Sequence, residues 1–314
     1  MFMTVLLSLI LPVLAGGGVI ALCWLLPPLR KWTWLSGVAF GLALSVGVLA
    51  SFVSDYGLPS FPPGQRAEWL GIMAMAGGVL ALLLPITGEP GQQRSWPLLE
   101  LAAVCVGGII VKLPLLAAFV SGMPIEEVSP KFTDMTWADQ IGMGLGVAFA
   151  ILLFDRVVAA RAGFLMPLVL AIVFGGLAPL ADAAGWITLT FLAATASGIS
   201  FVGAVAAAFS GSPSIGRGGL VAAAILLAVM PVAGFRQLYG EFPWWCWVLV
   251  VSSPWILLVF EIPVFSKMPP WASNTLRIVA VAALVGTGVV IATSNAGGTD
   301  DDGGMPGFGD YSYE

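Results

Sequence analysis

The sequence predicts an all-α protein, a polytopic bundle of about ten transmembrane helices, and three observations favour this fold class. The chain is 59% hydrophobic and 9% charged, whereas an ordinary soluble domain has about 25% charged residues. Its apolar runs are roughly 17–26 residues long, and a bilayer core is spanned by about 20 helical residues. The runs are continuous and do not alternate, which favours helices over the strands of a membrane barrel.

The predicted spans follow one another with short connectors. They cover residues 2–26, 34–53, 67–86, 98–120, 137–154, 163–181, 184–209, 218–234, 243–261 and 275–293. They form one transmembrane domain over residues 1–293, followed by an acidic segment, 294–314, that is rich in Gly, Asp and Tyr. This segment has too little apolar surface to order itself. We expect a disordered tail there, which either keeps the end soluble or docks a partner protein.

Basic residues predict the orientation of the spans. Lys and Arg in short loops favour the cytoplasm, and eight lie in or beside odd-numbered connectors against three in even-numbered ones. The odd set is Arg30, Lys31, Arg94, Arg156, Arg161, Arg217, Lys267 and Arg277, and the even set is Arg66, Lys131 and Arg236. The odd connectors should therefore be cytoplasmic and both termini non-cytoplasmic, in a plasma (inner) membrane. Asp155 and Glu261 are expected at the cytoplasmic interface.

Ten spans divide into halves of five, 1–155 and 156–293, which would be inverted in topology. Pro12 and Gly17 in the first span correspond to Pro167 and Gly175 in the sixth. Matched Gly and Pro interruptions of this kind mark the binding site in many secondary transporters, so these four residues are candidate helix breaks. Alternatively, the halves are unrelated, because Gly and Pro are common in membrane helices.

Lys112 is the deepest predicted charge, about 10 Å inside the fourth span at 1.5 Å per residue. A charge near the bilayer centre costs about 2.5–3.5 kcal/mol on insertion scales. One interpretation places Lys112 in an aqueous cavity, as a counter-ion for a substrate or in a switchable pair with Asp139 at the start of the fifth span. In the other, its long side chain reaches back to the interface.

The seventh span carries a face of hydroxyl and small side chains. Thr190, Ser197 and Ser200 are spaced so that they lie on one side of a helix. Such a face either packs closely on a neighbouring helix or lines a polar pathway. Gly142 and Gly146, four positions apart in the fifth span, are expected in a helix contact. The Ser252-Ser253-Pro254 run is expected to interrupt the ninth span.

Enzymatic activity is not expected, because the chain has no histidine. This excludes His-based triads, HExxH zinc sites and His-ligated haem. The three cysteines are isolated, and no basic stripe could neutralise nucleic-acid phosphates. We therefore predict no catalytic residue, metal, cofactor or nucleic-acid partner.

Two functional hypotheses follow from these observations. The first is a secondary transporter or permease for an unidentified small solute, supported by the five-plus-five count, the matched Gly and Pro residues and Lys112. The second is a non-catalytic membrane subunit or scaffold that binds partner proteins through its helices and tail. It is supported by the scarcity of buried ionisable groups, which ion-coupled carriers normally need.

Overall fold

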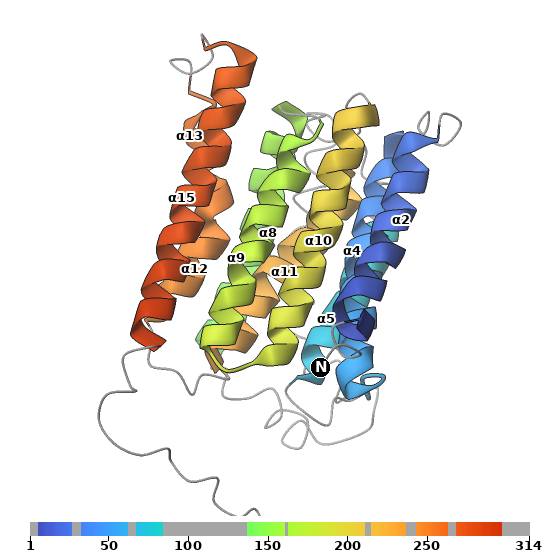
Figure 1. Cartoon of the computed structure of the whole chain (residues 1–314), viewed down its shortest axis with the longest axis vertical. Coiled ribbons are helices and arrows are strands. Elements are labelled where there is room, and N and C mark those ends of the chain that lie inside the picture. Colours follow the sequence, from blue (N-terminus) through green and yellow to red (C-terminus); the bar gives the residue numbers. More distant parts are fainter. Residues whose placement is uncertain are drawn as a thin grey trace, which may run out of the picture.

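The computed structural model describes residues 6–26, 33–61, 67–83, 137–160, 163–210, 215–236, 243–262 and 268–296. In these ranges the chain is helical, without strands, and the helices stand side by side as one bundle (Figure 1). Six of the helices are long and apolar enough to cross a membrane, and two further apolar stretches, Glu68–Leu83 and Trp245–Val259, are shorter. The all-α prediction is confirmed for this part of the chain, and its apolar helices indicate a membrane protein.

The described helices lie close to nine of the ten predicted spans, while span 98–120 lies outside the described residues. The elements are η1 (Leu6–Ile10), α2 (Leu11–Leu25), α4 (Thr33–Tyr56), α5 (Glu68–Leu83), α8 (Trp137–Ala160), α9 (Leu165–Ala183), α10 (Ile187–Ser210), α11 (Gly216–Arg236), α12 (Trp245–Ser252), η4 (Ser253–Trp255), α13 (Ile256–Val259) and α15 (Pro270–Ala296). The ten-span count itself stays a prediction.

The last helix is longer than predicted at both ends. α15 continues through Ala296, so the expected tail does not begin at Ser294. The Ser294 hydroxyl donates to the Ile291 carbonyl at 3.0 Å, and the Asn295 amide donates to the same oxygen at 2.9 Å. Both side chains therefore fold back onto the last two turns of the helix. The remaining tail residues, 297–314, lie outside the described residues.

Helices joined by short described connections run in opposite directions, whereas α5 and α8 run in the same direction, and the helix ends gather at two ends of the bundle (Figure 1). At one, which we call the Arg217 end, the Trp24 indole donates to the Ser36 carbonyl at 3.2 Å. At the opposite one, the Tyr56 end, the Trp186 indole donates to the Tyr56 hydroxyl at 3.3 Å. α2, α5, α8, α10 and α13 finish at the Arg217 end, where α4, α9, α11 and α15 begin.

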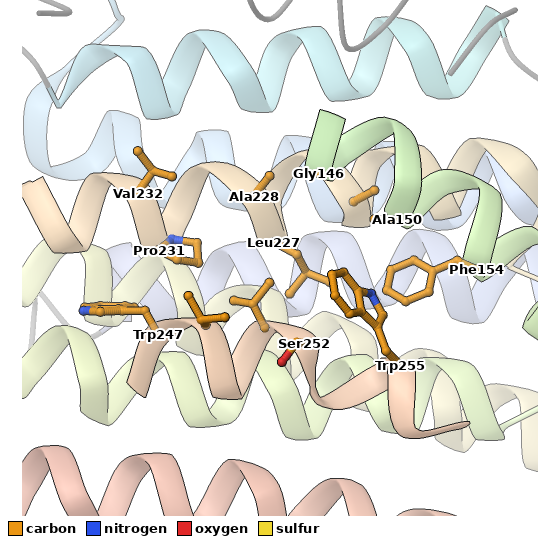
Figure 2. Close-up of a pocket in the computed structure, with 13 residues that line it drawn as sticks. Gly146, Ala150, Phe154, Leu227, Ala228, Pro231, Val232, Trp247, Ser252 and Trp255 are labelled. Carbon is orange, nitrogen blue, oxygen red and sulfur yellow. The ribbon is translucent and has the colours of Figure 1, made fainter. Parts of the chain in front are cut away.

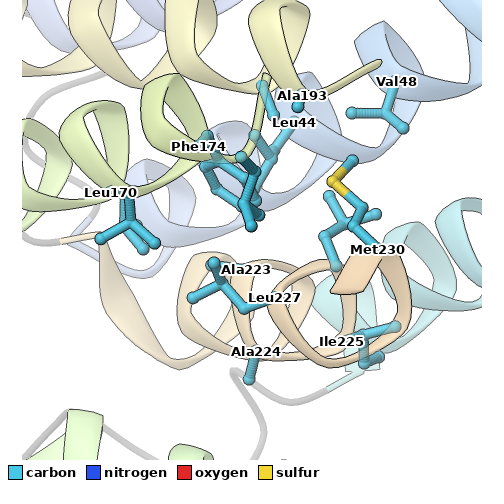
Figure 3. Close-up of a cluster of buried hydrophobic side chains, with 14 of the residues drawn as sticks. Leu44, Val48, Leu170, Phe174, Ala193, Ala223, Ala224, Ile225, Leu227 and Met230 are labelled. Carbon is cyan, nitrogen blue, oxygen red and sulfur yellow. The ribbon is translucent and has the colours of Figure 1, made fainter. Parts of the chain in front are cut away.

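The core lies where α4, α9, α10 and α11 meet (Figure 3). Leu44, Phe174 and Met230 are fully buried there. At the Arg217 end, α4 and α11 touch through their backbones. A Cβ at Gly37 would lie 2.8 Å from Gly216 Cα, and Gly216 has a φ of +56°, which favours glycine.

The predicted helix breaks have mixed outcomes. The first span is irregular, because the π-helix η1 precedes Pro12 at the start of α2. However, α2 and α9 remain continuous at Gly17 and Gly175, so no break is present at these glycines. Pro167 lies in the first turn of α9, where a missing N–H is tolerated.

The interruption predicted in the ninth span is confirmed. The α-helix gives way at Ser253 to the 3₁₀-helix η4 and resumes as α13. The inverted repeat stays a prediction. α4 packs along α5, whereas the corresponding pair, α10 and α11, make only slight contact.

Candidate functional site

The predicted pair of Lys112 and Asp139 is not addressed by the structure. Lys112 lies outside the described residues, and Asp139 is described only as part of the backbone of α8. Their pairing stays a prediction.

The three predicted residues of α10 have different surroundings. Thr190 donates to the Trp186 carbonyl one turn back, at 3.2 Å, and Ser197 donates across to the Ala171 carbonyl of α9 at 2.8 Å. Ser200 is fully buried, and its hydroxyl has no hydrogen-bond partner among the described residues.

The structure brings Ser197 together with Gly175. A Cβ at Gly175 would lie 3.1 Å from Ser197 Oγ, and both residues line a groove of about 530 Å³ between α9 and α10. Two of the other three helix-break candidates also face α10: a Cβ at Gly17 would lie 3.1 Å from Val202, and Pro167 lies beside Gly203. These small residues allow close helix contact.

A cluster of oxygen atoms surrounds η1 at the Tyr56 end. We call it the Ser8 cluster; its members are Ser8, Ser51, Ser54, Asp55 and Thr195. The Ser8 carbonyl accepts hydrogen bonds from Ser51 of α4 and, at 3.3 Å, from Thr195 of α10. The Ser8 hydroxyl donates to Asp55 Oδ1 at 2.7 Å and accepts from Ser54 at 2.8 Å.

The Ser8 cluster joins three helical segments through polar atoms. Ser8, Ser51 and Thr195 are buried, while Asp55 is exposed at the end of the bundle. Carbonyl, hydroxyl and carboxylate oxygens attract a cation or a hydrogen-bond donor. π-Helical turns frequently occur at functional sites. Hydrophobic periodicity gives no sign of a π-helix, so the sequence analysis missed this cluster; only Pro12 signalled an irregular first span.

A sealed ion pair joins α8 to α11 at the Arg217 end. Arg217 Nε lies 2.9 Å from Asp155 Oδ1, and Arg217 Nη2 lies 3.4 Å from Asp155 Oδ2. The two side chains are 0% and 1% exposed. This is a bidentate arginine–carboxylate contact, the strongest class of side-chain hydrogen bonding.

Asp155 lies five residues before the end of α8, and its position at the cytoplasmic interface stays a prediction. Its side chain is turned into the bundle, where Arg217 neutralises its charge. The sequence contains one signal of this burial, because Arg217 is flanked by Gly216, Gly218 and Gly219. Glycines on both sides let α11 approach its neighbours closely and so bury an intervening side chain.

A second pair joins α15 to the end of α13. Arg277 Nη2 donates to Glu261 Oε1 at 3.1 Å and to the Phe260 carbonyl at 2.9 Å. The guanidinium also lies 5.8 Å from the centre of the Phe260 ring. The Arg277 side chain is 1% exposed, but that of Glu261 is 32% exposed, so Glu261 is partly open to the surroundings. Its position at the cytoplasmic interface stays a prediction.

An apolar cavity of about 260 Å³ lies between α8, α11 and α12 (Figure 2). It is lined by Gly146, Ala150, Phe154, Ala224, Leu227, Ala228, Pro231, Val232, Trp247, Val248, Val251, Ser252 and Trp255. A Cβ at Gly146 would meet no atom within 4 Å among the described residues, so the packing contact expected there stays a prediction. The missing side chain leaves room for the cavity.

These features define a class of protein: an all-helical bundle of membrane-length apolar helices with one polar cluster, two arginine–carboxylate pairs and one apolar cavity in its described part. In the same ranges, no three Cys, Asp or Glu side chains are grouped so that they could hold a metal ion. No protein-family model, no curated protein and no solved structure matches the chain.

Proposed function

We propose that this protein is a secondary transporter or permease for a small solute, with the Ser8 cluster as part of its polar site. The observation that carries the proposal is the irregular first helix. In η1, the Ser8 carbonyl accepts hydrogen bonds from side-chain hydroxyls of two other helices. Transporters commonly bind solutes or coupling ions where a membrane helix is discontinuous and its backbone oxygens are accessible.

Two further observations support the predicted topology of ten spans with both termini outside. α5 finishes at the Arg217 end and α8 begins at the Tyr56 end, so residues 84–136 join opposite ends of the bundle. This connection supports a further span at 98–120, and with it ten spans. Arg156, Arg217 and Arg277 belong to helix ends at the Arg217 end, which we accordingly propose to be cytoplasmic, with both termini outside.

The Asp155–Arg217 pair fits a transporter as a closing contact. It connects α8, in the first predicted half, with α11, in the second, at the proposed cytoplasmic end. Alternating access requires the halves to separate at one end while they close at the other. A sealed pair is a contact with two discrete states, made or broken.

The proposal is tested with the full-length protein in proteoliposomes, using radiolabelled amino acids, sugars and organic cations as probes. For any probe that is transported, we expect Thr195→Val and Ser51→Ala to lower the initial rate at least about tenfold, the effect of losing one to two hydrogen bonds. Lys112→Ala should abolish transport without changing membrane insertion.

Thr287→Val is the matched control, because Thr287 is exposed on α15 and bonds only to the Ala283 carbonyl of its own helix, at 2.8 Å, among the described contacts. It should transport like the wild type. Wild-type rates for Thr195→Val, Ser51→Ala, Lys112→Ala and Lys112→Leu would show that the mechanism is wrong. Absence of transport for every probe would favour the second candidate.

The second candidate is a non-catalytic subunit or scaffold. It is favoured by the hydrogen bonds of α10, since Ser197 and Thr195 each bond to the backbone of a neighbouring helix and thereby fasten the bundle. This hypothesis predicts that deleting residues 297–314 removes a protein that co-purifies with the full-length chain. An unchanged set of co-purifying proteins would contradict it.

A further inference from the structure

The cavity between α8, α11 and α12 is long and narrow. The lining residues fall within three stretches of nine positions, between Gly146 and Phe154 on α8, Ala224 and Val232 on α11, and Trp247 and Trp255 on α12 and η4. At 1.5 Å per residue, each stretch is about 12 Å long. A volume of about 260 Å³ spread over that length gives a mean cross-section of about 20 Å². This is room for one hydrocarbon chain.

The lining offers almost nothing to a polar ligand. Ser252 is its one hydroxyl side chain, and that hydroxyl donates to the Leu249 carbonyl of its own helix at 3.4 Å. A cavity lined by apolar side chains stays dry and takes up apolar molecules, as an engineered cavity of about 150 Å³ takes up benzene. The cavity therefore excludes water and ions and favours hydrocarbon.

Part of the cavity lining lies at the surface of the bundle. Two of its lining residues on α12 and η4, Val248 and Trp255, are 52% and 38% exposed. Beside them on α8, Phe149 is 50% exposed and meets the Trp255 ring edge to face at 5.4 Å. α8 is 24 residues long, and the apolar stretch Trp245–Val259 is shorter. In a bilayer these exposed apolar side chains would face hydrocarbon.

We propose that this cavity binds the chain of a single-chain amphiphile, such as a fatty acid, which enters from the bilayer between α8 and α12. The inference goes beyond the proposed transport function, because the chain can bind whether or not it is moved across the membrane. A two-chain phospholipid fits less well, since its second chain would remain outside.

The test uses the full-length protein in nanodiscs of dioleoylphosphatidylcholine. The probe is palmitic acid that carries a photoactivatable diazirine in mid-chain. We expect cross-links on peptides of α8, α11 and α12, removed by excess unlabelled palmitate although phospholipid is already in large excess.

Two glycines provide a matched pair of variants. A Cβ at Gly146, in the cavity, or at Gly286, on α15 outside it, would meet no described atom within 4 Å. Gly146→Leu should fill the cavity and lower labelling of α8, α11 and α12 about tenfold, the factor expected for displacing about two buried methylene groups. Gly286→Leu should leave this labelling unchanged. Size-exclusion profiles of both variants confirm folding, and Ala150→Leu is a second filling variant.

Cross-links spread evenly over the exposed faces of the bundle, and unchanged by Gly146→Leu and Ala150→Leu, would overturn the inference. Labelling requires no flux, so it separates this inference from the proposed function. Localised, competed labelling without transport of any probe would support the chain-binding site and reject the transporter. Transport of a probe, with labelling spread evenly over the bundle, would support the transporter and reject the chain-binding site.

Discussion

Two arginines are buried in the described part of the bundle, and they are neutralised in different ways. Arg217 and Asp155 are both sealed from the surroundings and meet through two contacts. Arg277 is just as buried, but its carboxylate partner Glu261 is about one-third exposed, and the Phe260 carbonyl and ring share the guanidinium.

The difference shows where each charge is balanced. If one member of a fully buried pair is removed, water cannot reach the remaining charge to stabilise it. Each member of the sealed pair therefore needs the other to balance its charge. A partly exposed carboxylate remains hydrated, and its contribution resembles that of a surface pair, roughly 0–1 kcal/mol. The burial of the arginine alone therefore does not determine how much a pair stabilises the fold.

The largest expected effect is on the sealed pair. Asp155→Asn should lower the free energy of unfolding by about 3–5 kcal/mol, because it removes the carboxylate that balances Arg217 in a buried setting. The measurement is thermal unfolding in detergent micelles. The double variant Asp155→Leu with Arg217→Met should recover most of the loss, since apolar residues of similar volume replace buried pairs at little cost. A single variant as stable as the wild type would contradict the sealed environment.

A second variant disturbs the sealed pair indirectly, through the backbone contact between α4 and α11 that lies next to Arg217. Gly37→Ala places a Cβ 2.8 Å from Gly216 Cα, so α11 must shift, and we expect a loss of about 1–3 kcal/mol, typical of overpacking. Gly18→Ala is the control, because its Cβ meets no described atom within 4 Å. In a double-mutant cycle, Gly37→Ala should be non-additive with Asp155→Asn and additive with Glu261→Gln.

The smallest effect is expected at the second pair. Glu261→Gln should lower the unfolding free energy by about 1 kcal/mol or less, because Arg277 keeps the Phe260 carbonyl and its ring. Thermal unfolding under the same conditions measures it. If Glu261→Gln were as damaging as Asp155→Asn, exposure of the carboxylate would not be what distinguishes the two pairs.

The sequence predicted the positions of the helices well, because continuous apolar runs of membrane length leave few alternatives. The boundaries of α9 and α10 differ from prediction by only a few residues. It also predicted the interruption of the ninth span at the Ser253-Pro254 step, since proline cannot donate to a regular helix.

The candidate sites could be predicted only in part. Asp155 and Arg217 lie 62 positions apart, and a position at the edge of a span does not reveal whether the side chain turns inward or toward water. Arg217 and Arg277 are counted as loop charges in the prediction of the orientation. That count gives no indication that both side chains are buried. The cavity could not be predicted either, because Gly146 resembles any other packing glycine until its neighbours are known.

The order of Asp155 and Arg217 along the chain has a consequence for biogenesis. α8 leaves the ribosome before α11, so Asp155 must wait for its partner while the connecting helices α9 and α10 are synthesised. A buried carboxylate without its partner is costly, so α8 cannot reach its final contact before α11 has been made. The sealed pair therefore forms late in synthesis, after the two helices that separate its members along the chain.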